Sequence, residues 1–93
     1  MAVFVLVHGA WGGGWAYREI SERLRAEGHE VHVADLTGLG ERAHLLSPVI
    51  SLSTHIEDVA AIIEGRDLHD IILAGHSYGG MVISGVSDRM PDR

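Results

Sequence analysis

The sequence predicts an α/β fold, namely a three-stranded parallel sheet in the order 2-1-3 with helices on both faces. Three apolar, β-branched stretches alternate with stretches of helical character, an order typical of parallel βαβ units with right-handed crossovers. The first and third apolar stretches each end in a glycine-containing turn, one with His8 and the other with Ser77. If the third strand lies beside the first, these turns meet where open parallel sheets bind ligands.

The composition narrows the class of protein. The chain has 93 residues, 46% of them hydrophobic and 12 of them glycine, which predicts one small folded domain rather than a disordered chain. The net charge of −6 disfavours nucleic acids and anionic membranes as partners. No apolar run approaches the roughly 20 residues of a membrane span, and no signal peptide is recognisable. Because cysteine is also absent, we expect a cytoplasmic protein.

The first strand is expected at residues 3–7, because a continuous run of apolar, mostly β-branched residues suits a strand buried on both faces. A glycine loop at residues 12–14 follows it. Between Trp15 and Glu27, apolar residues recur at four-residue spacing among charged ones, which predicts an amphipathic helix. Gly28 is expected to cap the end of this helix.

The second strand is expected at residues 30–35, and residues 36–53 are interpreted as a long connection. The stretch 54–57 (Thr-His-Ile-Glu) is interpreted as a capping box, so a second helix is predicted to begin at Thr54 and to end at Gly65. These boundaries place the second crossover between residues 36 and 69.

The third strand is expected at residues 70–76 and leads into Gly75-His76-Ser77-Tyr78-Gly79. This stretch fits the G-x-S-x-G pattern of a nucleophile elbow, in which a strand–turn–helix exposes one serine at the end of a sheet. The serine is expected to be strained, and side chains two positions to either side of it would collide. The helix that follows is predicted to run towards Met90 and to stop at Pro91.

Five stretches, in this order and spacing, carry a resemblance to a known family: 5–11 (VLVHGAW), 13–15 (GGW), 28–31 (GHEV), 35–36 (DL) and 75–81 (GHSYGGM). They resemble the α/β-hydrolase superfamily, and more closely the small esterases grouped with plant methylesterases and hydroxynitrile lyases. The resemblance covers nearly the whole chain.

The resemblance implies a cofactor-independent hydrolase of small or medium carboxylic esters, in which Ser77 forms an acyl-enzyme. The backbone N–H groups of Ala10 and Tyr78 would form the oxyanion hole. Trp11 is a candidate for the substrate pocket. The supporting residues of the two loops are expected to be His8, Gly9, Gly75 and Gly79.

A serine nucleophile needs a base and an orienting acid, which in this family follow the serine in the order acid, then histidine. After Ser77 the chain has Asp88 and Asp92 but no histidine, and Asp88 lies on the helix that leaves the elbow. We therefore expect residues 1–93 to be the N-terminal part of a single α/β-hydrolase domain. A C-terminal segment or a second chain would supply the acid and base, and the 93 residues alone would be inactive.

Two other functions stay open. One is a non-catalytic, ligand-binding module of the same fold, and the other is lyase, perhydrolase or C–C hydrolase chemistry at the same serine. Family lyases carry a threonine where this chain has Gly9, and they need a lysine, which this chain lacks. Both differences favour ester hydrolysis over cyanohydrin cleavage.

The remaining candidates have plainer interpretations. His76 is expected to pack or bond within the fold rather than to act as a base, and His8 to hold its loop. Trp15 and Tyr17 either line an acyl pocket or wedge the first helix against the sheet. Residues 38–43 match a relaxed G-x-G-x-x-A pattern but follow the second strand, so they are interpreted as a loop near the pocket. The other histidines are expected at the surface, without metal-ligand spacing: His29, His32, His44, His55 and His69.

Overall fold

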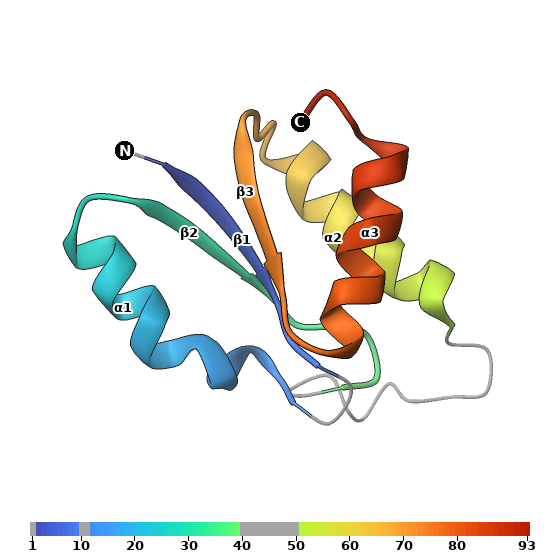
Figure 1. The fold of residues 1–93 in the computed structure, drawn as a ribbon, viewed down its shortest axis with the longest axis horizontal. Helices are drawn as coiled ribbons and strands as arrows, with labels where there is room; N and C mark the ends of the chain where they lie inside the picture. The colour runs from blue at the N-terminus through green and yellow to red at the C-terminus, as the bar shows by residue number, and fades with distance from the viewer. Residues whose placement is uncertain (1, 10–11, 40–50) are drawn as a thin grey trace.

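The computed structural model describes residues 2–9, 12–39 and 51–93, and every structural statement below concerns these residues. Strands and helices alternate along the chain (Figure 1). In order they are β1 (Val3–Val7), the short 3-10 helix η1 (Gly14–Tyr17), α1 (Arg18–Ala26), β2 (Glu30–Ala34), α2 (Leu52–Gly65), β3 (Ile71–Gly75) and α3 (Tyr78–Arg89).

The three strands form one parallel sheet in the order β2-β1-β3, as the sequence predicts. In this register Val5 lies opposite His32 on one side and Leu73 on the other. Val5 and Val7 are fully buried because β1 is the central strand. The parallel register brings the C-terminal ends of β1 and β3 together, with Val7 opposite Gly75.

The helices cover both faces of the sheet (Figure 1). Helix α1 lies on one face, and α2 and α3 lie side by side on the other. The main core fills the space between the sheet and the α2–α3 layer. Its buried residues are Val5, Val7, Ala34, Leu36, Val59, Ile63, Leu68, Val82 and Val86.

The packing of α1 differs from the predicted apolar stripe. Ile20 is 50% exposed, whereas Ser21 is 4% exposed and is the buried residue of the helix. The Ser21 hydroxyl donates to the Arg18 carbonyl at 3.0 Å, so the serine is buried without leaving a polar group unpaired. Helix α1 thus packs on a face rotated by about one residue from the one that the four-residue spacing indicates.

The start of α2 is also different from the prediction. The helix begins at Leu52, with Ser51 as its N-cap, so the assignment of a capping box to residues 54–57 was wrong. Thr54 is instead the third helical residue, and its Oγ1 accepts a hydrogen bond from the Ser51 N–H at 3.1 Å. The first helix also starts later than predicted, because the 3-10 helix η1 occupies residues 14–17 and α1 begins only at Arg18. The remaining predicted ends agree with the structure within one residue, and Gly28 follows α1 with φ +91°. Among the described residues, no helix is long and apolar enough to cross a membrane.

Candidate active site

Ser77 lies in the turn between β3 and α3, where it is exposed. Its backbone has φ 56° and ψ −119°, a conformation that a residue with a side chain rarely adopts. Such strain persists only where the surrounding structure enforces it, and it is common at functional sites. The turn therefore has the geometry that the G-x-S-x-G pattern predicts for an elbow.

The two flanking glycines explain how the turn closes. A Cβ atom added at Gly75 would lie 2.5 Å from the Gly79 carbonyl oxygen. One added at Gly79 would lie 2.5 Å from the carbonyl oxygen of Val7 and 2.8 Å from that of His8. These distances are far below normal contact, so only glycine allows β3, α3 and the end of β1 to come this close.

The chain that leaves β1 lies directly beside the serine. A Cβ atom at Gly9 would be 3.5 Å from the Ser77 Cβ, and the His76 N–H donates to the Val7 carbonyl at 3.2 Å. The turns after β1 and β3 therefore share one end of the sheet. Ala10 and Trp11, the predicted second oxyanion donor and pocket residue, lie outside the described residues.

His8 ties this chain to the one that leaves β2. Its side chain is buried, and its Nε2 accepts a hydrogen bond from the Leu36 N–H at 3.1 Å. Because an amide nitrogen only donates, the ring proton is on Nδ1, which donates to the Gly9 carbonyl at 2.7 Å. Both ring nitrogens are occupied, so His8 holds the loop in place and has no free position from which to accept a proton.

The backbone N–H groups at the start of α3 are candidate hydrogen-bond donors to an anion. Gly79 N–H donates to the His76 carbonyl and Gly80 N–H to the Ser77 carbonyl, both at 2.9 Å. None of the hydrogen bonds between described residues engages the N–H of Tyr78, the first residue of the helix. A helix start of this kind presents unpaired N–H groups and a partial positive charge, which suit a developing anion.

A cavity of about 620 Å³ opens beside Ser77. Tyr17 forms part of its wall, and its hydroxyl donates to the Val7 carbonyl at 2.7 Å. Burial raises the pKa of the Tyr17 hydroxyl, so this donor keeps its proton at neutral pH. Trp15 is 54% exposed and is not part of the wall. The lining residues are His8, Gly9, Gly12, Ala16, Tyr17, His76 and Ser77.

Comparison with known proteins decides the family. A model of the alpha/beta hydrolase family matches residues 4–91. This chain belongs to that family. The sheet order 2-1-3, the elbow at Ser77 and the shared end of β1 and β3 are all consistent with this assignment.

The relatives of this chain include esterases. The carbendazim hydrolyzing esterase of Nocardioides sp. (strain SG-4G) is 58% identical over 97% of this chain and 37% of its own length. Methylesterase 10 of Arabidopsis thaliana is 33% identical over 97% of this chain and 33% of its own length. This chain thus spans about a third of the length of these relatives.

A solved structure agrees with the fold. An extracellular alpha/beta-hydrolase from a Paenibacillus species superposes with a TM-score of 0.90 at 35% identity, covering 100% of this chain and 37% of the other. The three-stranded unit described here is therefore a recurring part of larger hydrolases of this family.

Contrary to the expectation from the sequence, His76 does not pack within the fold. The residue is exposed and lines the cavity beside Ser77. The reason is its position at the end of β3, which has a strand neighbour on one side only in the described sheet. The sequence alone could not predict this exposure, because the G-x-S-x-G pattern specifies the turn but not which other residues cover it.

His55 was expected at the surface, and this was wrong. It is 7% exposed and lies on the buried side of α2, with Val59 and Ile63 four and eight residues later. That spacing is the signal that could have identified it. His29 and His32 are half-buried, while His69 is exposed as expected and His44 lies outside the described residues. Within the described ranges, no three side chains of metal-ligand type come together.

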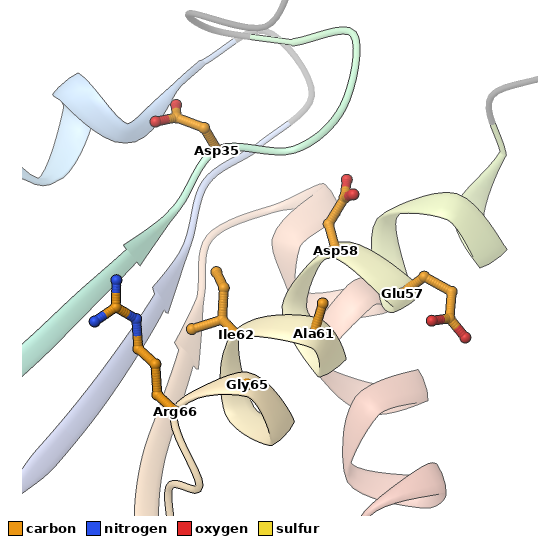
Figure 2. A pocket seen from close by; sticks show the side chains of 7 residues that line it. All are labelled: Asp35, Glu57, Asp58, Ala61, Ile62, Gly65 and Arg66. Atoms are coloured by element: carbon orange, nitrogen blue, oxygen red, sulfur yellow. The ribbon is translucent and has the colours of Figure 1, made fainter.

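A second hollow of about 850 Å³ lies between the end of β2 and α2 (Figure 2). Three carboxylates stand around it, and two of them hold loops: Asp35 accepts from the Gly14 N–H at 2.7 Å, and Asp58 accepts from Thr37. Although it is larger, no serine is among its described lining residues, so the cavity beside Ser77 is the candidate active site. Its lining residues are Asp35, Glu57, Asp58, Ala61, Ile62, Gly65 and Arg66.

Proposed function

We propose that this chain carries the nucleophile and oxyanion hole of a serine hydrolase that cleaves small or medium carboxylic esters. The observation that supports this most strongly is the exposed Ser77, in a strained backbone conformation, beside the N–H of Tyr78, which bonds to no other described residue. The family membership and the esterases among the relatives support the class of reaction.

In the proposed reaction, the Ser77 oxygen attacks the ester carbonyl carbon while a base removes the hydroxyl proton. The carbonyl electrons move to oxygen, and the N–H groups of Tyr78 and Ala10 stabilise that oxyanion. The intermediate then collapses, the alkoxide leaves with a proton from the base, and an acyl group stays on Ser77. The base then takes a proton from a water molecule, whose oxygen attacks the acyl carbon. The second tetrahedral intermediate collapses, the carboxylic acid leaves, and the base returns the proton to the Ser77 oxygen.

The base and its orienting acid come from a C-terminal segment or a second chain. Asp88 and Asp92 are the only acidic residues after Ser77, no histidine follows it, and Asp88 lies on α3 itself. We call this chain together with the part that supplies the acid and base the complete hydrolase. The 93 residues alone are expected to bind esters without turning them over.

The substrate is proposed from the relatives and the cavity. The Nocardioides esterase hydrolyses carbendazim according to its name, so carbendazim is the first compound to test beside a simple carboxylic ester. A cavity of about 620 Å³ with a mainly apolar wall suits an ester of this size. No cofactor is required for this chemistry.

The test measures hydrolysis of 4-nitrophenyl acetate and carbendazim by the complete hydrolase and by the 93-residue chain. Ser77→Ala should abolish turnover, whereas the control Ser84→Ala should not change it. Ser84 is an exposed serine on α3, the helix that follows Ser77, and among the described residues its hydroxyl donates to the Gly80 carbonyl one turn earlier. Turnover that survives Ser77→Ala contradicts the proposal.

The same assay separates the other functions. A complete hydrolase that binds an ester tightly but never cleaves it would be a ligand-binding module. Cleavage of a cyanohydrin or a diketone in preference to both esters would assign the serine to lyase or C–C hydrolase chemistry. Gly9, which stands where family lyases carry a threonine, argues against cyanohydrin cleavage.

A further inference from the structure

A pair of side chains, the buried His55 and the half-buried Tyr78, joins α2 to the first residue of α3. The Tyr78 hydroxyl lies 2.7 Å from the Nδ1 of His55, and the Nε2 of His55 lies 2.9 Å from the Thr37 carbonyl oxygen. Because the carbonyl only accepts, the neutral ring carries its proton on Nε2. Nδ1 is then the acceptor, and the Tyr78 hydroxyl donates to it.

Thr37, the far partner of His55, is itself held by α2. Its N–H and its hydroxyl donate to the two oxygens of Asp58, at 2.7 and 2.8 Å. Asp58 comes three residues after His55, so both project from the same side of the helix. One turn of α2 therefore fastens both the chain that leaves β2 and the start of α3.

The contact between the two rings is well defined. The ring centroids of His55 and Tyr78 are 5.5 Å apart, and the ring planes meet at 81°, an edge-on arrangement. Burial raises the pKa of the Tyr78 hydroxyl, which therefore stays a donor at neutral pH. A partly buried network in which the polar groups bond to one another restricts its members to one geometry.

This network ends on the residue whose backbone N–H is the proposed oxyanion donor. An oxyanion donor lowers the barrier only if it is already aimed at the place where charge develops. Ser77, immediately before it, is strained at φ 56° and would relax if the start of α3 were free to move. Holding the Tyr78 side chain from α2 limits that movement.

We infer that His55 is a positioning residue, which holds the N–H of Tyr78 in place through the Tyr78 hydroxyl. This inference rests on the proposed esterase function. Loss of an interaction that forms only in the transition state lowers kcat. Loss of an interaction that is equally strong in the bound substrate and in the transition state raises KM instead. Loss of the pair should therefore lower kcat and leave KM nearly unchanged.

Three variants of the complete hydrolase test this. Tyr78→Phe keeps the ring and the backbone N–H but loses the hydroxyl. His55→Leu removes both hydrogen bonds, and His55→Gln keeps one donor and one acceptor. Removing an oxyanion donor costs about 10²–10³ in kcat, so misplacing one should cost about tenfold. We expect that loss in Tyr78→Phe and His55→Leu, with most activity recovered in His55→Gln.

The double variant and an inhibitor sharpen the test. If the two side chains act as one unit, His55→Leu combined with Tyr78→Phe should lose no more than either single variant. The inhibition constant of phenylboronic acid, which forms a tetrahedral adduct on an active serine, should rise in parallel with the fall in kcat. Ser21→Ala is the control, because it removes a buried hydroxyl on α1, away from the elbow.

Unchanged kcat and boronate affinity in Tyr78→Phe would overturn the inference, whether or not the melting temperature falls. That variant decides the matter even if His55→Leu fails to fold. Failure of the proposed function would look different, since hydrolysis would then survive Ser77→Ala. If Ser77→Ala abolishes hydrolysis and Tyr78→Phe leaves it unchanged, the proposed function stands and only the positioning role of His55 is refuted.

Discussion

Gly79 offers a direct test of why the elbow needs glycine. A methyl group at this position would lie 2.5 Å from the Val7 carbonyl oxygen and 2.8 Å from the His8 carbonyl oxygen. Both neighbours are backbone atoms of the central strand and its end, so neither can rotate away. Overpacking typically costs about 1–3 kcal/mol, and the rigid surroundings place Gly79→Ala at the upper end, about 3 kcal/mol.

Gly80 provides a matched control on the same turn of α3. An added Cβ atom meets nothing within 4 Å among the described residues, so Gly80→Ala brings only the better helix propensity of alanine, about 1 kcal/mol. Gly79→Ala gains the same amount and is therefore destabilising by about 2 kcal/mol in total. The two variants should differ by about 3 kcal/mol in the free energy of unfolding.

Urea denaturation followed by circular dichroism measures this difference. With a slope of about 1 kcal/mol per M for a small protein, the two midpoints should lie about 3 M apart. The wild-type protein should lie between them. Equal midpoints for Gly79→Ala and Gly80→Ala would refute the close approach of α3 to β1.

Two further variants test the surroundings of the site. His8→Leu should lower the free energy of unfolding by about 1–3 kcal/mol, because it leaves the Leu36 N–H without its acceptor. Thermal and urea unfolding measure this change. An unchanged stability would contradict the hydrogen bond between His8 and Leu36. Burial raises the pKa of Tyr17 and Tyr78 in the folded state, so their contribution to stability is complete below about pH 10 and is lost as pH rises above it. The free energy of unfolding of the wild-type protein, measured between pH 8 and 11, should show this loss of stability. The double variant Tyr17→Phe/Tyr78→Phe should lose less stability over the same range, and identical pH profiles would contradict the burial of the two hydroxyls.

The parts of the fold that sequence predicts well are those set by local sterics. Residues 3–7 can form little other than a buried strand, and Gly75 and Gly79 flank a turn that no other residue type permits. Gly28, two residues after the end of α1, is predictable for the same reason, because its φ of +91° favours glycine.

The parts that sequence misses depend on neighbours from other elements. Helix α2 begins at Leu52 because Ser51 and Thr54 bond to each other, a choice that the polar stretch 51–54 leaves ambiguous. The burial of His55 depends on partners 18 and 23 residues away, Thr37 and Tyr78. Likewise, Ser21 is buried rather than Ile20 because of how α1 lies on the sheet.

The most direct test of the central claim is to trap the acyl group on Ser77. The complete hydrolase would be mixed with excess 4-nitrophenyl acetate, quenched with acid within the first turnovers and digested for peptide mass spectrometry. The account predicts an acetyl group on the peptide that contains Ser77, and none in the Ser77→Ala variant. Steady hydrolysis with an acyl group on another residue, or on none, would contradict it.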